Sequence, residues 1–383
     1  MKKVRIRITI VLIVTLVIAL FVCGLFLLKK DQVNGLTSGD RFIAGTRDVI
    51  CGQYYFFEKD GVFCYRLLDS EVSETLPIFN DVLADGTDNP FPHISGYYSM
   101  LVASSLESES EKAPVLVIAH GYIERPIGSE KPRYLYRIVS FDMSTQQVYV
   151  IKDSITSSVQ SLSLYKDRIF FTTNEGDLGY DMHTVQTNGT NYRKIENANG
   201  DFFRILYAAE GRVYCYKEGL KELYSCDIDL NEFNYLFNIE LIPEMFVNDG
   251  FIYYSTNHQG GETDGKHWVY CDLYRRPLSD ISKEELLLSK VTVGRNEGNK
   301  FYFYSFENAA LSDDGYDAYG TSVLYAFDLK TKQRTTIYDF KSENVQTEYV
   351  AISDKYLIYW RREESQELCF CINLITKEET RLM

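Results

Sequence analysis

Residues 203–216 read "FRILYAAEGRVYCY", two short runs of aromatic and β-branched residues joined at Glu210-Gly211. Such residues suit a pleated surface, and two runs flanking a small turn predict a β-hairpin. The next stretch, residues 222–240, reads "ELYSCDIDLNEFNYLFNIE" and contains two further runs of the same kind. Fewer than forty residues therefore predict a four-stranded antiparallel sheet.

This unit recurs along the chain. The second strand of each repeat is expected to begin near Tyr54, Val115, Ile169, Val213, Ile252, Tyr302 and Leu357. Their spacing averages about 50 residues, the period of four-stranded propeller blades. With 30 Tyr, 23 Phe and no helical pattern outside the N-terminal segment, the sequence predicts an all-β fold, a β-propeller of seven four-stranded blades over residues 41–383. The long repeat from residue 96 to 153 leaves six or eight blades as alternatives.

Closing the ring is the physical reason for the repetition. A twisted four-stranded sheet buries both faces only against neighbouring sheets, and a closed ring leaves no terminal sheet exposed. The last repeat supplies its own fourth strand in "KEETRLM". Closure therefore does not require a strand from the N-terminus, although "RFIAG" at residues 41–45 could pair there.

The first thirty residues differ from the remainder. The opening "MKKVRIR" carries four positive charges, and residues 8–28 form a run of 21 residues without a charge. About 20 apolar residues are enough to cross a hydrocarbon core. Residues 1–30 are thus expected to form a cytoplasmic stub and a transmembrane signal-anchor, and residues 31–40 a linker. Four basic residues precede the run and two follow it, so the N-terminus is expected in the cytoplasm and the propeller outside the cell membrane.

Two other interpretations of this segment fit the residues less well. A cleaved signal peptide has an apolar core of roughly 7 to 15 residues and a small-x-small cleavage site, and this run is longer and has no A-x-A pattern. Lipid attachment at Cys23 requires a small residue before it, where Val22 stands. The uncleaved single-pass anchor is the interpretation that fits the run.

Charge and cysteine content restrict the partners. The net charge is −14 for the whole chain, and beyond residue 30 the 34 basic and 54 acidic residues give −20. Such an acidic domain repels nucleic acid, so we expect none as a partner. The chain has eight cysteines but no C-x-x-C spacing, which indicates neither a zinc ribbon nor a full disulfide framework. A bridge between Cys215 and Cys226 is possible.

Residues 168–195, "RIFFTTNEGDLGYDMHTVQTNGTNYRKI", carry a resemblance to known repeats. The strand Ile169–Thr172, the residue Met182, the turn "TNGTN" and the pair Lys194-Ile195 resemble the repeat of bacterial extracytoplasmic β-propellers of unknown function. These are similar in style to low-density-lipoprotein-receptor-like and TolB-type propellers. The resemblance implies the fold and no catalytic residues, and the regular Tyr-Trp-Thr-Asp strands of the receptor type are missing here.

Three motifs suggest chemistry, and each has a plainer interpretation. "VLVIAHGY" at residues 115–122 is similar to a hydrolase strand, but no G-x-S-x-G elbow occurs, so His120 is expected to be a strand-end residue. Asp313, Asp314 and Asp317 could offer oxygens to calcium, but a solvated loop is favoured because the spacing is not that of an EF-hand. His258 and His267 with Glu262 and Asp264 lie in a glycine-rich connection, which does not hold metal ligands in place. We expect no catalytic residues, no metal and no cofactor.

Long insertions give the functional hypothesis. They separate the second and third strands at residues 120–133, 257–267 and 307–320, and the connections between blades are expected to emerge at the same end of the ring. Function on rigid scaffolds concentrates on such loops, although drift in tolerant loops would give the same pattern. The predicted recognition residues are Tyr122, Arg125, His258, His267, Asp314, Tyr316 and Tyr319.

The sequence therefore predicts an anchored extracytoplasmic scaffold that binds a protein, a peptide or a glycan in the cell envelope without catalysis. One alternative is a glycan-active hydrolase with acidic residues at the propeller channel. Another is a domain that only spaces or docks a second membrane component. The similar stretches at residues 141–151, 327–337 and 372–382 are assigned a structural role, because Asp142, Asp328 and Asn373 can each fix the turn between a third and a fourth strand.

Overall fold

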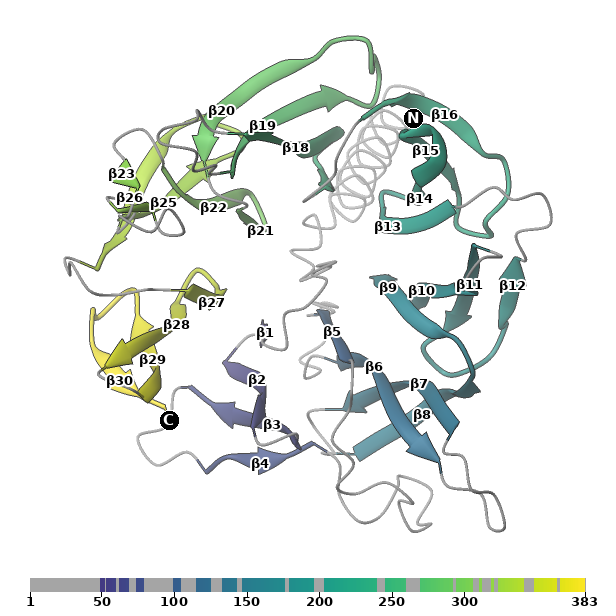
Figure 1. Cartoon of the computed structure of the whole chain (residues 1–383), viewed down its shortest axis with the longest axis horizontal. Coiled ribbons are helices and arrows are strands. Elements are labelled where there is room, and N and C mark those ends of the chain that lie inside the picture. Colours follow the sequence, from purple (N-terminus) through teal and green to yellow (C-terminus); the bar gives the residue numbers. More distant parts are fainter. Residues whose placement is uncertain are drawn as a thin grey trace, which may run out of the picture.

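The computed structural model describes residues 49–382 with internal gaps. The gaps are residues 52, 60–61, 69–73, 79–98, 105–114, 125–132, 143–146, 176–178, 196–202, 240–244, 260–268, 292–293, 306–309, 312–317, 320–322, 341–347 and 364–365. Within this part of the chain, seven four-stranded antiparallel sheets are arranged around a common axis (Figure 1).

Each blade is built from strands that follow one another in the chain. The strands of blades 1 to 4 are β1 (Val49–Cys51), β2 (Tyr54–Lys59), β3 (Val62–Leu67), β4 (Leu76–Pro77); β5 (Ser99–Ser104), β6 (Val115–Glu124), β7 (Arg133–Asp142), β8 (Gln147–Ile155); β9 (Ser158–Tyr165), β10 (Arg168–Asn174), β11 (Tyr180–Gln186), β12 (Arg193–Ile195); β13 (Phe203–Ala209), β14 (Arg212–Lys217), β15 (Glu222–Asp227) and β16 (Asn234–Asn238). Those of blades 5 to 7 are β17 (Met245–Asn248), β18 (Phe251–Gln259), β19 (Val269–Pro277), β20 (Glu285–Val291); β21 (Arg295–Glu297), β22 (Lys300–Tyr304), β25 (Val323–Asp328), β26 (Arg334–Asp339); β27 (Glu348–Ile352), β28 (Tyr356–Glu363), β29 (Gln366–Asn373) and β30 (Glu379–Arg381).

The first strand of each blade lies nearest the axis, and the fourth lies at the rim (Figure 1). The inner strand β1 contacts both β5 and β27, and β13 contacts β9 and β17. The seven-blade prediction is therefore confirmed, and the alternatives of six or eight are wrong. Every second strand begins within two residues of the position expected from the sequence.

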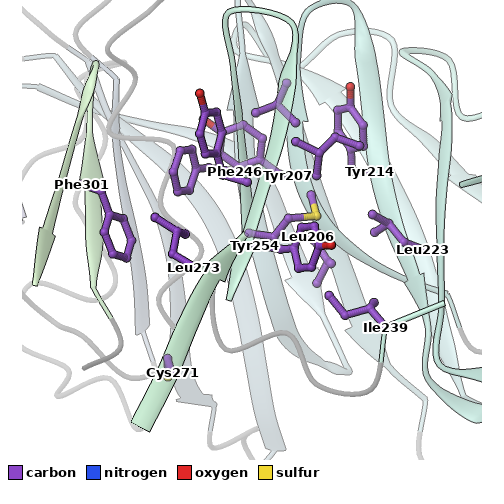
Figure 2. Packing of buried hydrophobic residues seen from close by; sticks show 14 of the residues in the cluster. Leu206, Tyr207, Tyr214, Leu223, Ile239, Phe246, Tyr254, Cys271, Leu273 and Phe301 are labelled. Atoms are coloured by element: carbon purple, nitrogen blue, oxygen red, sulfur yellow. The ribbon is translucent and has the colours of Figure 1, made fainter. Parts of the chain in front are cut away.

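The core lies between the blades. Because side chains alternate along a strand, each second strand buries residues against both neighbouring sheets. In blade 3, Ile169 and Phe171 pack toward blade 2, and Phe170 packs toward blade 4. Figure 2 shows the cluster between blades 4 and 5, where aromatic and aliphatic side chains of both sheets fill the space, with Phe301 of blade 6 beside them.

Blades 1 and 7 close the ring by side-chain packing. Tyr55 and Ile358 lie in one buried cluster, and the Tyr55 hydroxyl lies 3.9 Å from Cys369 Sγ. Arg66 Nη1 donates to the carbonyl oxygen of Leu382 at 3.0 Å. Blade 7 has its own fourth strand, β30, as expected. Residues 41–45 lie outside the described residues, and so does the predicted membrane run.

In the part of the chain that the structure describes, no helix is long and apolar enough to cross a bilayer.

Six cysteines are reduced and buried: Cys64, Cys215, Cys226, Cys271, Cys369 and Cys371. The possible bridge between Cys215 and Cys226 is not formed. Cys215 Sγ donates to Met182 Sδ at 3.8 Å. A hydrogen bond with the Cys226 thiol, and burial after it, raise the pKa of Cys215. These thiols act as small core residues.

The turns between third and fourth strands repeat one hydrogen-bonding pattern. Asp328 Oδ1 accepts from the backbone N–H groups of Lys330 at 3.0 Å and Thr331 at 2.7 Å. Asn373 Oδ1 accepts in the same way from Ile375 and Thr376. The predicted structural role of Asp328 and Asn373 is confirmed, whereas the turn after Asp142 lies among residues 143–146, outside the described part.

Replacing Asp328 with alanine is expected to lower the free energy of unfolding by about 1 kcal/mol, since two hydrogen bonds to an exposed turn are lost. Asp328→Asn should retain most of the stability because Asn373 makes the same turn in blade 7. Urea denaturation of the two variants measures both values. Equal losses for alanine and asparagine would contradict the assigned hydrogen-bonding role.

Candidate functional site

The two ends of the ring are built differently. In a four-stranded meander, the connections between second and third strands leave the sheet at the same end as the connections from one blade to the next. We call this end of the ring the loop face. The short turns between first and second and between third and fourth strands lie at the opposite end, which we call the turn face.

Two hairpins on the loop face are longer than the others. The β6–β7 ladder has ten residue pairs and ends at Glu124 and Arg133, and the β18–β19 ladder has nine and ends at Gln259 and Val269. Among the described residues, the ladder between second and third strands has five to eight pairs in the other blades. We call residues 121–124 of β6 and 255–259 of β18 the extended parts of these strands; at roughly 3.4 Å per residue they are about 14 and 17 Å long.

Blade 6 carries an additional hairpin at the same end. It consists of β23 (Ala310–Leu311) and β24 (Ala318–Tyr319), inserted between its second and third strands. Blades 5 and 6 are neighbours, and blade 2 lies three blades from blade 5 around the ring (Figure 1). Extra structure therefore stands on two separate sectors of the loop face.

The predicted recognition residues lie in these insertions where the structure describes them. Tyr122 stands on the extended part of β6, opposite Leu135. His258 stands on the extended part of β18, opposite Tyr270, and Tyr319 is on β24. These three residues lie toward one end of the ring, on three different blades. The other four predicted residues, Arg125, His267, Asp314 and Tyr316, lie outside the described residues.

His120 is not at a strand end, which corrects the prediction for this residue. The strand β6 continues four residues further, and His120 is completely buried. Arg137, opposite on β7, donates from Nε to His120 Nδ1 at 3.2 Å. The sequence could not indicate this because the extension of the ladder depends on the pairing with β7.

A polar network in blade 3 was not predicted from the sequence. Glu175 follows β10 on the loop face, and its carboxylate accepts from Ser157 Oγ at 2.7 Å and from Thr173 Oγ1 at 2.9 Å. Thr173 Oγ1 also lies 2.8 Å from His183 Nε2, and His183 Nδ1 lies 3.0 Å from the Tyr192 hydroxyl. A continuous chain of hydrogen bonds thus runs from the loop face to the outer strand of the blade.

The donor and acceptor roles in this network follow from the fact that each hydroxyl has a single proton to donate. Thr173 gives its proton to Glu175, so His183 must donate to Thr173 from Nε2. Nδ1 is then the acceptor for the Tyr192 hydroxyl. The network therefore selects the neutral Nε2–H tautomer of His183.

The surroundings of His183 also favour its neutral form. Its ring stacks on Phe171 with centroids 4.5 Å apart and is 4% exposed. Burial lowers the pKa of His183 to about 4; the carboxylate of Asp181 opposes this shift, and the ammonium groups of Lys194 and Lys152 add to it. His183 is consequently uncharged at neutral pH.

The position that His183 occupies on the third strand is aromatic in other blades. Directly opposite residues on the second and third strands form stacked aromatic pairs in blade 5, Tyr254 with Tyr274, and in blade 7, Tyr359 with Phe370. In blade 3 the same place on the third strand is taken by His183, opposite Phe171. Alignment of the seven repeats, strand by strand, is the sequence signal that could have found it.

A second charged cluster lies on the loop face next to blade 3. Glu218, at the start of the 3₁₀ turn η2 (Glu218–Leu220), accepts from the Tyr180 hydroxyl at 3.2 Å. Arg204 Nε lies 3.5 Å from the other oxygen of Glu218. Burial, and then the Glu218 charge, raise the pKa of Tyr180. The loop face between blades 3 and 4 is thus lined by a carboxylate, a guanidinium and a phenol.

The capacity of these groups for metal binding is limited within the part of the chain that is described. No cluster there of three or more His, Cys, Asp or Glu side chains could hold a metal ion. The buried carboxylate Asp181 is ion-paired with Lys194 at 2.7 Å. The aspartates 313, 314 and 317 lie outside this part.

Comparisons with known proteins find similar chains among solved structures alone. No protein-family model and no curated protein sequence matches the chain. Similar solved structures include the β-propeller domain of the Trilobed protease from Pyrococcus furiosus, at 15% identity, TM-score 0.47, 70% of this chain and 82% of that one. A chain of a nidogen/laminin complex has 12% identity, TM-score 0.40 and coverage of 76% and 95%. TolB from Acinetobacter baumannii has 11% identity, TM-score 0.35 and coverage of 70% and 69%.

Proposed function

We propose that this chain is a membrane-anchored extracytoplasmic scaffold that binds a protein, a peptide or a glycan in the cell envelope through the loop face of its propeller. The observation that carries the proposal is the greater length of the β6–β7 and β18–β19 ladders than of the corresponding ladders described in the other blades, together with the β23–β24 hairpin at the same end. The turn face has no comparable extension among the described strands.

Regular pairing in the extensions supports a role in recognition. Every residue from Gly121 to Glu124 is paired with β7, and every residue from Ser255 to Gln259 is paired with β19. A ladder pairs the backbone groups and restricts the backbone before binding, which reduces the entropy lost on binding. The acidic domain suits cationic or uncharged partners.

Anchorage is part of the same proposal. It rests on the 21-residue run without a charge at residues 8–28 and on the basic residues before it. The N-terminus would then be cytoplasmic and the propeller extracytoplasmic. The hydrolase alternative has no specific support in the described residues, where the buried carboxylate Asp181 is held by Lys194.

Shortening the hairpins tests the proposal. Residues 258–270 are replaced with Asn-Gly, which fits a two-residue hairpin turn and keeps the pair Asn257 and Cys271. A second variant has Asn-Gly in place of residues 306–322. A third has Asn-Gly in place of residues 123–134 and also carries Tyr122→Ser. Each full-length variant is produced in place of the wild-type chain in its own cells and cross-linked there, and the attached proteins and glycans are quantified by mass spectrometry.

At least one of these variants is expected to lose a partner that the wild-type chain retains, by tenfold or more, with the melting temperature within about 3 °C. Ile375→Ser is the matched control, since Ile375 is 72% exposed on the turn face, and it should retain that partner. Unchanged cross-linking in all three hairpin variants would contradict the assignment of the loop face.

A further inference from the structure

The contact between blades 2 and 3 contains a titratable group at its centre. We define the blade 2–3 joint as Ser157, Thr173, Glu175, His183 and Tyr192. Ser157 lies in the connection from β8 to β9, so its hydrogen bond to Glu175 ties the strand connection to the loop after β10. His183 is the one member of the joint that would gain charge at mildly acidic pH.

Blade 2 also packs on the outer end of the joint. The Lys152 ammonium on β8 lies 4.4 Å from the centroid of the Tyr192 ring. Near Tyr192, a Cβ atom on Gly189 would lie 3.3 Å from the carbonyl oxygen of Ile151, so the turn there approaches β8 closely. The joint is thus held at both ends, by Ser157 at the loop face and by β8 at the rim.

Charged groups surround His183 on several elements. Asp181 precedes it by two residues on β11, Lys194 stands opposite it on β12, and Lys152 faces it from β8. The Asp181 carboxylate is 2.7 Å from Lys194 Nζ, so it is already engaged with a cation. Glu175 is separated from the imidazole by Thr173.

Protonation of His183 conflicts with this arrangement. A proton on Nδ1 makes this nitrogen a donor, so the Tyr192 hydroxyl must rotate and accept where it donated before. The imidazolium would be 4% exposed and close to two ammonium groups. A buried charge is costly unless it is well paired, and opening the joint to water removes this cost.

We propose that the blade 2–3 joint is a pH-responsive hinge: protonation of His183 reverses its hydrogen bond with Tyr192 and places a buried charge beside Lys152 and Lys194, and the contact between blades 2 and 3 opens locally while the other interfaces stay closed.

The direction of the pH effect follows from the chemistry of His183. Its pKa is about 4 in the folded chain and 6.5 when the group is free, so protons bind preferentially to the open joint. The closed joint has its full stability above pH 6.5 and loses it as the pH falls toward 4. At pH 4.5 the opening equilibrium is expected to shift by roughly 10- to 100-fold, since each pKa unit corresponds to a factor of ten.

Hydrogen exchange of the full-length chain tests the hinge without any ligand. Wild type is compared with His183→Gln, and with His183→Phe, which recreates the aromatic pair of blade 7. Comparison at the same pH cancels the intrinsic dependence of amide exchange on pH. The measurement follows peptides of β9, β10 and β11, with peptides of β22 and β25 in blade 6 as the internal control.

At pH 7.5 the wild type and a folded variant should exchange alike in these strands. At pH 4.5 the wild-type strands of blade 3 should exchange at least tenfold faster than those of the variant, and blade 6 should not differ. Equal exchange at pH 4.5 would overturn the proposal, and so would faster wild-type exchange in all blades, because that indicates global unfolding. If one substitution prevents folding, the other gives the comparison.

Discussion

Replacing Tyr55 with alanine is expected to lower the free energy of unfolding by about 3–5 kcal/mol, the usual cost of deleting a large buried aromatic side chain. Tyr55 is completely buried between blades 1 and 7, and it stacks on Phe57 with ring centroids 4.8 Å apart. At each of the other six contacts, the polypeptide runs directly from one blade into the next and connects the two covalently. Blades 1 and 7 have no such covalent connection, so only noncovalent contacts, mainly side-chain packing, hold them together.

Tyr302→Ala is the matched control for the contact between blades 1 and 7. Tyr302 is equally buried, 1% exposed, between blades 6 and 7, which the chain connects. Both variants should lose stability in urea denaturation. Only Tyr55→Ala is expected to reduce hydrogen-exchange protection in β1 and β30 more than in the other strands, because the ring can open there without global unfolding. A loss below about 1 kcal/mol, or uniform loss of protection, would contradict this view of closure.

Replacing Thr172 with valine is expected to cost about 1–3 kcal/mol, although the two side chains have nearly the same shape. The inner strand β13 has an irregularity between Ile205 and Tyr207. The Ile205 N–H there donates to Thr172 Oγ1 of blade 3 at 2.9 Å, and both residues are fully buried. Valine would leave this N–H group without its partner, which costs the desolvation energy of the group.

Thr184→Val is the control for the valine substitution. Thr184 is 2% exposed, and its hydroxyl has no hydrogen-bond partner within the described part of the chain. This variant should be neutral or stabilised by up to about 1 kcal/mol, since a buried polar atom is removed. A second hydrogen bond from the backbone of β13 to blade 3 runs from the Ala208 N–H to Ser163 Oγ at 3.1 Å. Ser163→Ala removes it and should further lower the free energy of unfolding when combined with Thr172→Val. Equal denaturation midpoints for the two valine variants would contradict the role given to Thr172.

Predictions that depended on local chemistry were accurate. The strands and the turns at Asp328 and Asn373 depend on residues that are close together in the sequence. Strands follow from alternating burial, and these turns follow from a side chain that accepts from N–H groups two and three residues later. The period of about 50 residues then gave the number of blades, since one sheet cannot bury both faces alone.

Contacts between blades could not be predicted from neighbouring residues in the sequence. The residues Tyr55 and Cys369 meet although 314 positions separate them, and Thr172 reaches Ile205 across 33. His183 looks like any polar residue on a strand until the structure places it on Phe171 and beside Tyr192. One sequence offers no signal for the contacts of Tyr55 with Cys369 and of Thr172 with Ile205, because each partner alone fits many other environments.

The sequence by itself therefore determined the blade: four strands, their turns and their repetition around a ring, all governed by periodicity and turn chemistry. Only the tertiary structure decided how the ring closes, which hairpins extend at the loop face and where a histidine is held neutral. These features arise when sheets distant in the chain pack together, and the free energy of that packing depends on both surfaces at once.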